Sequence, residues 1–546
     1  MRQLFQKSIL LLGLAYLGGA AQAQTDVPED YLSPQFHKGR REAARSLMPD
    51  SSVLVVFAAP TRTFSNDVDY LYHQNPDLYY FTGYKEPHAV LLLFKEAQTA
   101  ADGTKYNEAF FVQKRDASRE QWTGKRLGVE GVKKNLGIQT VFNGADFKAF
   151  HLDVKKLKSI FFELPEGIAD ETADTADLFD LVASFRQKAR IAADYNGALY
   201  SDLNMFANRA TADNLPRIVA YFKSRMDANE SYRANTFMQS IVSLKDSAAM
   251  ERTRAAIKND VFSSNQYQTI TASLREIKTP EELDLIRKAV EISCSGQNEV
   301  MKTVRADMSE LEIQGLHEYV HKKYGAEEVG YGSIVGAGEN GCVLHYMENT
   351  KTRVGNDMLL MDVGAEYHGY TADVTRTVPA DGKFSAEERA IYQLVYDAQE
   401  AAFKILKDGA TWSDAGKAAN EVIANGLLRL GIIKKKEDVR KYYPHGLSHH
   451  IGLDVHDKGV SQTLKKGMVI TIEPGIYIPA NSDCDKKWWS IAVRIEDDAL
   501  IRENDYELLS ASAPRSIEAI EKMIAEKSVL DNYKLPPLKT AAKKAF

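Results

Sequence analysis

Four acidic residues in the second half of the chain stand beside apolar segments, where a carboxylate needs a specific partner. They are Asp362, Asp373, Glu473 and Glu496. Asp362 directly follows the apolar run 358–361, which indicates a buried strand rather than a solvated surface. If the chain reverses near Tyr367 and His368, Asp362 and Asp373 stand opposite each other on paired strands. Facing carboxylates repel unless a cation lies between them, so these positions predict a divalent-cation site.

Histidines are concentrated in the same part of the chain. Four of the twelve are His445, His449, His450 and His456. Carboxylate ligands with a single imidazole, His449, and no thiolate favour Mn²⁺, Co²⁺ or Fe²⁺, with Zn²⁺ as a further option. Such a set would hold two ions about 3.5–4 Å apart, the arrangement of two-metal hydrolases. Because alternate residues of a strand point to the same face, Arg494 and Glu496 lie on one face of the strand predicted over 491–497. Two such charged residues on a buried face either belong to the site or form an ion pair with each other.

Capping boxes mark where the helices around these residues begin. Thr279 with Pro280 and Glu282 opens a long helix, and Ser309 and Ser385 open two more. We expect helices over 280–302, 310–323 and 386–409, and strands over 331–335, 358–363, 371–378, 467–473 and 491–497. The C-terminal half is therefore predicted to be α+β, with antiparallel hairpins.

The N-terminal half is predicted to be α/β, followed by helices. Buried strands are expected at 53–57, 89–94 and 109–112, with a helix at 36–47. The stretch 171–270 is mostly helical and carries no pattern that suggests chemistry. The chain is divided into a signal peptide (1–23), a non-catalytic α/β domain with a helical extension (24–272), a catalytic domain (273–510) and a helical, then basic, tail (511–546).

The first 23 residues have the features of a secretory signal. Arg2 and Lys7 precede the apolar run 8–20, and AQA at 21–23 fits the cleavage rule. The run is too short to span a bilayer, so we expect a periplasmic or secreted protein without a stable membrane anchor. The net charge of −6 argues against nucleic acid as a partner, and three cysteines provide neither a disulfide framework nor a CxxC pair.

Two further motif matches are rejected. His317 and His321 fit the HExxH spacing of zinc peptidases, but the position where a third ligand is needed holds Asn340. The interpretation preferred here is a helix whose apolar stripe faces the core with the histidines flanking it. The run 336–341 matches GxGxxG, but a strand-like segment (342–346) follows it where a dinucleotide site requires a helix.

Five motifs occur in an order that resembles aminopeptidase P, the proline-specific enzymes of the pita-bread metallopeptidase superfamily. They are Asp362 with Asp373 eleven residues later, HGLSH (445–449), DVH (454–456), IEPG (472–475) and RIEDD (494–498). The segment 331–349 is similar to the family's substrate-binding segment, and 74–93 and 119–128 are similar to its non-catalytic domain. The resemblance implies an α+β pita-bread catalytic domain behind an α/β N-terminal domain.

The resemblance also implies an activity. It is a metal-dependent exopeptidase that releases the N-terminal residue from peptides with proline in the second position, through a hydroxide that bridges two divalent ions, with Mn²⁺ expected. Asp362 would bind one ion, Asp373 and Glu496 both ions, and His449 and Glu473 the other. Glu473 would also pass a proton to the leaving proline nitrogen.

The remaining implied residues concern the substrate and the assembly. His345 and His456 would bind the substrate and stabilise the oxyanion, and His445 would orient the substrate backbone. Arg494 would hold the carboxylates, and Tyr331 and Tyr477 would form walls of the substrate pocket. Trp122 and Asp77 match positions that lie near a neighbouring subunit's site in oligomers of the family. A homo-oligomer, dimer or tetramer, is therefore expected. His450 replaces a residue that is often aromatic in the family, and we expect it to fill space.

Two alternatives stay open. A prolidase, which cuts Xaa-Pro dipeptides, shares the fold and the ligands. Ser448 and the large N-terminal domain favour the aminopeptidase. A non-catalytic scaffold homologue without metals predicts at least one lost ligand, whereas all five ligand positions hold competent residues.

Overall fold

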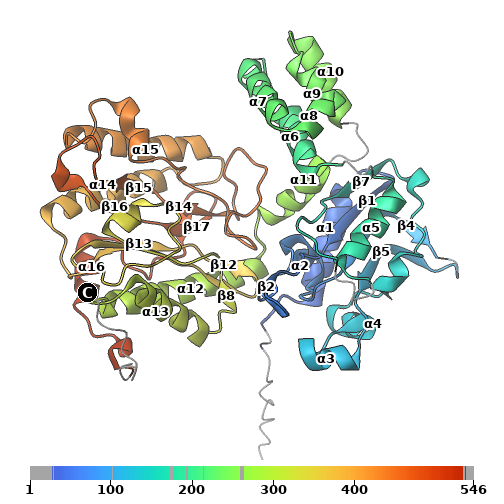
Figure 1. Ribbon diagram of the computed structural model, residues 1–546, viewed down its shortest axis with the longest axis horizontal. Helices are drawn as coiled ribbons and strands as arrows, with labels where there is room; N and C mark the ends of the chain where they lie inside the picture. The colour runs from blue at the N-terminus through green and yellow to red at the C-terminus, as the bar shows by residue number, and fades with distance from the viewer. Residues whose placement is uncertain are drawn as a thin grey trace, which may run out of the picture.

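The chain forms two lobes joined by a helical extension. The computed structural model describes residues 28, 30–100, 102–170, 176–191, 195–212, 214–258, 264–532 and 535. The two lobes lie side by side, and the extension rises above the region where they meet (Figure 1). The predicted signal peptide lies outside the described residues, as does nearly all of the basic end of the tail. No described helix combines the length and apolar character needed to cross a membrane.

The N-terminal lobe is built on a mixed five-stranded sheet in the order β6-β5-β4-β1-β7. Its strands are β1 (Ser52–Phe57), β4 (Val90–Thr99), β5 (Lys105–Val112), β6 (Val141–Asn143) and β7 (Ser159–Phe162). Strand β4 pairs antiparallel with β1 and β5, while β7 and β6 pair parallel to β1 and β5. Every residue of β1 is buried, which confirms the strand predicted from its apolar run.

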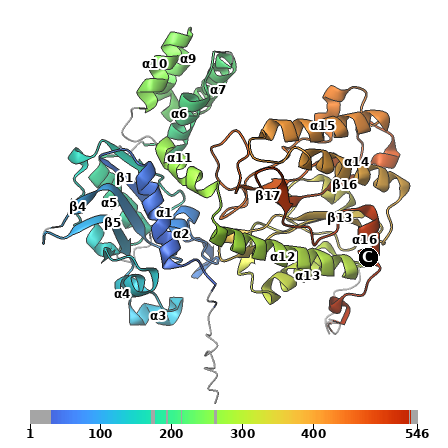
Figure 2. The same ribbon diagram turned by 180° about the vertical axis from the view of Figure 1, so that it is seen from behind.

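Helices surround this sheet, and a small exposed hairpin projects from the lobe. The helices are α1 (Pro34–Leu47), α2 (Pro76–Thr82), α3 (Ala117–Thr123), α4 (Gly128–Gly131) and α5 (Leu178–Ala189); the hairpin pairs β2 (Thr63–Ser65) with β3 (Val68–Asp69). Helices α1 and α5 cover opposite faces of the sheet (Figure 2). Short 3₁₀ or π turns occupy Val132–Leu136, Gly144–Phe147 and Val154–Lys156.

The helical extension has a core of its own. It comprises α6 (Gly197–Arg209), α7 (Leu215–Ala228), α8 (Glu230–Ala234), α9 (Thr236–Val242) and α10 (Ser247–Lys258), and α11 (Ser264–Arg275) leads on to the C-terminal lobe. Leu203, Phe206 and Phe222 are fully buried in a cluster separate from those of the two lobes. The prediction of helices in this stretch is confirmed.

The C-terminal lobe places small antiparallel sheets between pairs of helices. The strands are β8 (Glu328–Val329), β9 (Ile334–Ala337), β10 (Met358–Asp362), β11 (Ala365–Tyr367), β12 (Tyr370–Thr371), β13 (Thr375–Pro379), β14 (Val469–Ile472), β15 (Gly475–Ile478), β16 (Ile491–Arg494), β17 (Asp497–Ile501) and β18 (Tyr506–Leu508). They form sheets ordered β13-β10-β9, β12-β11-β8, β14-β17-β18 and β15-β16. Strand β16 of the second half packs against β10 and β13 of the first half, so strands from both halves of the lobe meet.

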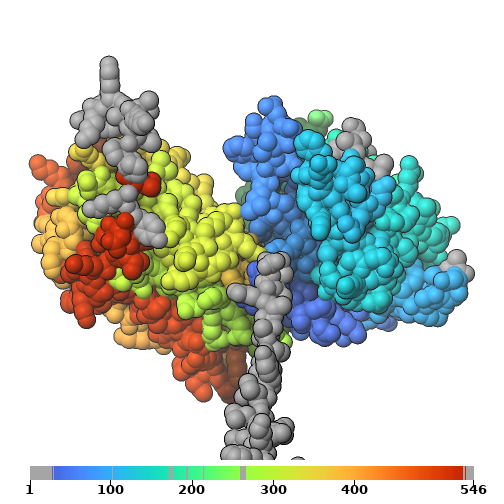
Figure 3. Space-filling model, turned by 90° about the horizontal axis from the view of Figure 1, so that it is seen from below, coloured from blue at the N-terminus to red at the C-terminus, as the bar shows by residue number. Residues whose placement is uncertain are grey.

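Long helices lie on both sides of these strands. They are α12 (Pro280–Thr303), α13 (Glu310–Lys323), α14 (Ala386–Phe403) and α15 (Trp412–Arg429), with α16 (Ile517–Ile524) near the end of the described chain and 3₁₀ turns at Gly338–Cys342, Lys436–Lys441, Lys486–Trp488 and Val529–Asn532. Helices α14 and α15 lie on one side of the strands and α12 and α13 on the other (Figure 1). Seen from below, the N-terminal and C-terminal lobes are distinct bodies that meet over a limited area (Figure 3).

The register of the hairpin that carries Asp362 and Asp373 differs from the prediction. His368 and Gly369 have φ values of 51° and 85°, so they form the tip of a tight turn. This tip lies one residue later than predicted, which moves every cross-strand partner by two. Asp362 therefore faces Thr375, and Asp373 lies in the segment between β12 and β13.

The segment after β9 also differs from the prediction. We predicted a strand-like segment over 342–346, but a 3₁₀ turn that begins at Gly338 ends at Cys342, and residues 343–345 continue as a bend and a turn. These turns leave no extended run that could pair as a strand. The helix predicted over 386–409 ends earlier, at Phe403, and the strands predicted over 371–378 and 491–497 are each divided in two.

The capping box at the start of α12 supplies a stability prediction. The Thr279 hydroxyl accepts a bond from the Glu282 backbone N–H, and the Glu282 carboxylate accepts one from the Thr279 N–H. Thr279→Ala removes one of these bonds and should lower the free energy of unfolding of the catalytic lobe by about 1 kcal/mol. Urea unfolding followed by tryptophan fluorescence measures it, and Thr279→Ser, which keeps the hydroxyl, should match the unsubstituted protein.

Candidate metal centre

One cavity of the C-terminal lobe, of about 380 Å³, gathers the residues that the sequence singled out. It is lined by Tyr331, Gly332, Ile334, Leu344, His345, Met347, Asp362, Asp373, His445, Gly446, Ser448, His449, Val455, His456, Glu473, Arg494 and Glu496. All five predicted metal ligands face it, although they come from segments up to 134 residues apart. A larger cavity, of about 970 Å³, lies where the helical extension meets both lobes.

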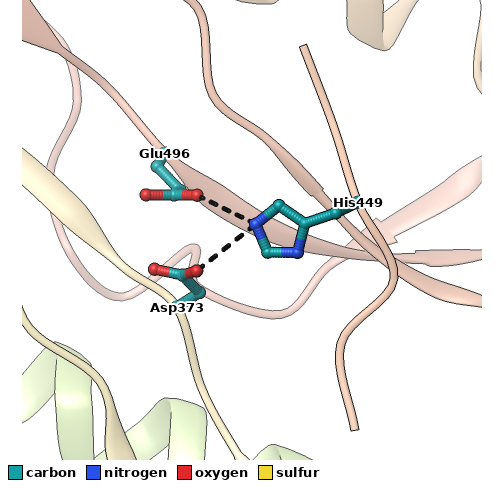
Figure 4. A group of neighbouring side chains, drawn as sticks. All are labelled: Asp373, His449 and Glu496. Atoms are coloured by element: carbon teal, nitrogen blue, oxygen red, sulfur yellow. Dashed lines mark ion pairs between the residues drawn. The ribbon is translucent and has the colours of Figure 1, made fainter. Parts of the chain in front are cut away.

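The imidazole of His449 faces three carboxylates. Its Nε2 atom lies 3.5 Å from Asp373 Oδ2, 3.4 Å from Glu473 Oε1 and 4.0 Å from Glu496 Oε1. Figure 4 shows the ring pointing between Asp373 and Glu496. Among the described residues, Asp373, His449 and Glu496 form the cluster whose ligand atoms are close enough together to share one ion.

Asp362 lies on the far side of the same cluster. The Tyr331 hydroxyl is 2.6 Å from both Asp362 Oδ1 and Asp373 Oδ1, and Arg494 Nη2 donates to Asp362 Oδ2 at 2.6 Å. A phenol has one proton and can donate to one of these carboxylates at a time. The other contact requires a proton on the carboxyl group or a cation beside it.

The electrostatics of the site favour a cation. Burial and the neighbouring Glu496 raise the pKa of both Asp373 and Glu473 well above the ordinary values. Burial, followed by repulsion from Asp362, raises the pKa of Glu496 to about 8. A divalent ion among these oxygens would replace mutual repulsion by attraction and allow all the carboxylates to ionise.

His449 is prepared to act as a ligand. Its Nδ1 lies 3.0 Å from the His450 carbonyl oxygen, which can only accept, so Nδ1 carries the proton and Nε2 presents a lone pair to the carboxylates. Burial lowers the pKa of His449 to about 4, which keeps the ring neutral at physiological pH. Four carboxylates and one neutral imidazole fit divalent ions of the Mn²⁺, Co²⁺, Fe²⁺ or Zn²⁺ kind.

The residues predicted to bind substrate lie around this cluster. His456 packs edge to face on His449, with ring centroids 4.3 Å apart, and His345 is exposed at the cavity wall. His445 Nδ1 donates to the Gly446 carbonyl, so its Nε2 accepts from the Tyr477 hydroxyl at 2.8 Å. Tyr477 accepts in turn from Arg494 at 3.0 Å, and lies behind His445 rather than on the cavity wall.

Two predicted residues lie elsewhere. Trp122 is 88% exposed on α3 of the N-terminal lobe, and its contact with a neighbouring subunit stays a prediction. Asp77 of α2 is 2% exposed and forms ion pairs with Arg275 and Lys458 at 2.8 and 2.7 Å within this chain; its place near a neighbouring subunit's site also stays a prediction.

Other residues near the cluster were not predicted from the sequence. Thr375 donates to Glu496 Oε2 at 2.6 Å, and Asp498 accepts from the Asp373 backbone N–H at 3.0 Å. The signal that could have found Thr375 is its place two residues after Asp373. His450 is buried against Trp412, with ring centroids 4.8 Å apart, and fills space outside the cavity as expected.

The HExxH pair of α13 is part of the core. His317 and His321 are 0% and 1% exposed, so they belong to the buried face of the helix instead of flanking it. His317 Nε2 lies 3.4 Å from the Met361 sulfur, and its other packing neighbours include Gly296 of α12. In the described part of the chain, no third ligand completes a metal site with these two histidines.

The cluster of buried carboxylates around a neutral imidazole, set between two helix-flanked sets of strands, is characteristic of metal-dependent hydrolases. Comparisons with known proteins agree. Residues 284–503 match the family described as Metallopeptidase family M24, and residues 37–161 match the Aminopeptidase P, N-terminal domain. Both matches fall inside the domains predicted for them.

Individual relatives cover nearly the whole chain. The Xaa-Pro aminopeptidase of Escherichia coli (strain K12) is 31% identical over 505 residues, 90% of this chain and 98% of that protein. The mitochondrial intermediate cleaving peptidase 55 of Arabidopsis thaliana is 28% identical over a region that covers 89% of this chain and 82% of the Arabidopsis protein. Zinc-substituted E. coli aminopeptidase P in complex with product has a TM-score of 0.70 at 29% identity, covering 91% of this chain and all of its own.

The chain therefore belongs to the aminopeptidase P family of M24 metallopeptidases. Its C-terminal lobe has the pita-bread fold, and the N-terminal lobe is the domain that accompanies it in this family. The protein is a metallopeptidase, a hydrolase that uses divalent metal.

Metal binding should depend on the carboxylates of this cluster. Asp373→Asn should weaken Mn²⁺ binding by more than about 100-fold, because losing even a residue that merely orients a ligand costs about 10–100-fold. Calorimetric titration of chelator-stripped protein measures it. The exposed Asp381→Asn is the control, and equal Mn²⁺ affinity in both variants would contradict this assignment.

The buried histidines of α13 should make the protein acid-labile. Burial lowers the pKa of His317 to about 3, below the ordinary value near 6.5. Between these values the unfolded chain binds the extra proton, so the stability that neutral His317 contributes is complete above pH 6.5 and falls as the pH drops. The slope should be about 1.4 kcal/mol per pH unit. In urea unfolding at a series of pH values, His317→Asn should remove this contribution to the slope of the free energy of unfolding against pH. The exposed His151→Asn should leave the slope unchanged.

Proposed function

We propose that this protein releases the N-terminal residue from peptides whose second residue is proline. The observation that carries the proposal is the convergence of His345, His445 and His456 on the cavity that holds the carboxylate cluster. The Xaa-Pro aminopeptidases among the relatives act, as their name says, on Xaa-Pro bonds. A peptide bond placed in this cavity would meet a metal site and hydrogen-bonding groups together.

The five-residue cluster would hold two divalent ions, for which we propose Mn²⁺. Asp362 would hold one ion, His449 and Glu473 the other, and Asp373 and Glu496 both. When bound, such ions lower the pKa of water toward neutrality and polarise a carbonyl oxygen. Arg494, hydrogen-bonded to Asp362, keeps that carboxylate turned toward the cluster.

Glu473 would act as the proton carrier. Its carboxylate lies 3.4 Å from His449 Nε2, at the cavity wall and at the end of β14 just before Pro474. Burial and repulsion by Glu496 raise its pKa, which brings its affinity for protons closer to that needed by an acid–base catalyst near neutral pH. It would take a proton from the attacking water and return it to the proline nitrogen, which must be protonated to leave.

The histidines would bind the substrate through their N–H groups. His456 lies beside His449, where its imidazole N–H would donate to the carbonyl oxygen as negative charge develops there. His345, which also lines the cavity, would do the same. His445 is fixed by Tyr477 and by its own neighbouring carbonyl, and would align the substrate backbone.

The preference for proline has a physical basis in the same cavity. An Xaa-Pro bond is a tertiary amide, so its nitrogen brings no N–H that the enzyme must satisfy. Apolar side chains line the cavity beside the metal cluster, and would cover the pyrrolidine ring. They are Ile334, Leu344, Met347 and Val455.

We also propose a homo-oligomer and an exported protein. The exposure of Trp122 supports the oligomer, since a large aromatic side chain that is 88% accessible in one chain is a candidate contact for another. The signal pattern of residues 1–23 supports export to the periplasm or beyond.

The activity is tested with the mature protein, stripped by chelator and reloaded with Mn²⁺. Release of the first residue from an Xaa-Pro-Yaa tripeptide should require metal and be much faster than cleavage of the matching Xaa-Pro dipeptide. Glu473→Gln should lower kcat by about 10²–10⁴-fold, the usual contribution of a general acid–base group. Faster cleavage of the dipeptide would instead identify a prolidase, and cleavage of neither peptide would contradict the proposed substrate.

A further inference from the structure

We propose that a buried ion-pair network between the two lobes positions His456. Asp77, Arg275 and Lys458 would then be positioning residues for a histidine that none of them touches. This inference rests on the proposed function, in which His456 stabilises developing charge on the substrate. It assigns the N-terminal lobe a part in the reaction, through a fixed loop of the catalytic lobe.

The network joins the start of α2, the end of α11 and the loop after His456. Asp77 accepts from Arg275 Nη1 at 2.8 Å and from Lys458 Nζ at 2.7 Å. Arg275 also forms an ion pair with Asp457, whose other carboxylate oxygen accepts from Lys278 Nζ at 2.8 Å. Two carboxylates and three cations thus alternate across the contact between the lobes.

Four of the five members of this network are shielded from water, and the fifth, Lys458, is 26% exposed. Asp77, Arg275, Lys278 and Asp457 have side chains that are 0–3% exposed. Burial alone would raise the pKa of Asp77, but Lys458 and Arg275 hold it at about 2, so the carboxylate is charged at any pH at which the enzyme would work. Removing one partner from such a buried group leaves an unpaired charge, which drives the neighbouring chain to rearrange.

The loop after His456 is held at Asp457, Lys458, Val460 and Ser461. The Asp457 backbone N–H donates to the His450 carbonyl at 2.9 Å, and its Oδ1 accepts from the Lys458 N–H at 2.8 Å. Further along, Glu276 accepts from the N–H groups of Val460 and Ser461 at 2.9 and 3.0 Å. Glu276 follows Arg275 directly, so the end of α11 holds the loop at two points.

Asp457 and Lys278 approach Gly452 closely. A Cβ atom at Gly452 would lie 2.1 Å from Asp457 Oδ2 and 2.6 Å from Lys278 Nζ. Real Cβ atoms essentially never have neighbours closer than 3.0 Å, so only glycine at 452 allows this approach. The backbone of His456, one residue before Asp457, is therefore fixed by its surroundings.

The His456 ring depends on that backbone. Within the described residues its imidazole has no protein hydrogen bond, and its ring contact is the edge-to-face packing on His449. The Asp454 carboxylate accepts from the His456 backbone N–H at 2.9 Å, which again fixes the main chain. With no hydrogen bond of its own, the ring lies where the loop puts it, and a small displacement of the loop would displace its N–H from the substrate carbonyl.

A double-mutant cycle tests the inference. Asp77→Asn and Lys458→Met are each made in the native sequence and in His456→Ala. In the native background we expect kcat to fall by about 10–100-fold with KM nearly unchanged, as for loss of a group that acts in the transition state. In His456→Ala the same changes should alter kcat less than about 2-fold, because coupled residues are non-additive. Equal losses in both backgrounds would overturn the proposal.

Three controls separate positioning from general damage. Lys458→Arg keeps the charge and should retain most of kcat. Lys85→Met breaks another ion pair between the lobes, with Glu327 at 2.8 Å, that includes no member of this network, and should leave kcat unchanged. Mn²⁺ affinity should be the same in all variants. A loss of kcat in Lys85→Met as large as in Asp77→Asn would mean that any weakening of the contact between the lobes is sufficient, and would overturn the proposal.

Hydrogen exchange separates failure of this inference from failure of the proposed function. The backbone N–H groups of Lys458, Val460 and Ser461 should exchange at least about 10-fold faster in Asp77→Asn if the network fixes the loop. Unchanged exchange would overturn the positioning role even in an active enzyme. If the native protein cleaves no Xaa-Pro peptide while exchange still accelerates, the proposed function fails and the structural link between lobe and loop stands.

Discussion

Mutual repulsion among buried carboxylates is the constraint on which the catalytic lobe depends. Asp362, Asp373, Glu473 and Glu496 face one cavity, and three of them have raised pKa values because burial and their neighbours oppose their charge. Metal ions would remove this cost when bound. The protein supplies partial compensation of its own through Arg494, Tyr331 and Thr375, which also aim the carboxylates inward.

This constraint explains why strands from both halves of the lobe end at the same point. Asp362 ends a short strand and the other three carboxylates lie within two residues of one, and the rigid backbone limits how far each can turn away from its neighbours. His449 is oriented by the adjacent carbonyl of His450. The loop beyond it reaches His456 and then the N-terminal lobe, so the site is continuous with the contact between the lobes.

Much of the fold and the site could be predicted from the sequence because the signals are local. The capping box at Thr279 and the apolar runs at 53–57 and 358–361 depend on neighbouring residues, and the elements they predict are present. The hairpin register could not be predicted, since it depends on positive φ at His368 and Gly369. The ion pairs of Asp77 could not be predicted either, because its partners, Arg275 and Lys458, lie 198 and 381 residues away in the chain.

The separate core of the helical extension has a consequence for synthesis of the chain. Helices α6–α10 make contacts that are close in sequence, and such contacts form quickly as a chain emerges from the ribosome. The catalytic cluster is the opposite case, since Asp362 is made 132 residues before Arg494, its ion-pair partner. We therefore expect the nascent protein to carry a folded extension while its acidic residues are still far apart, so that the repulsive centre is assembled last.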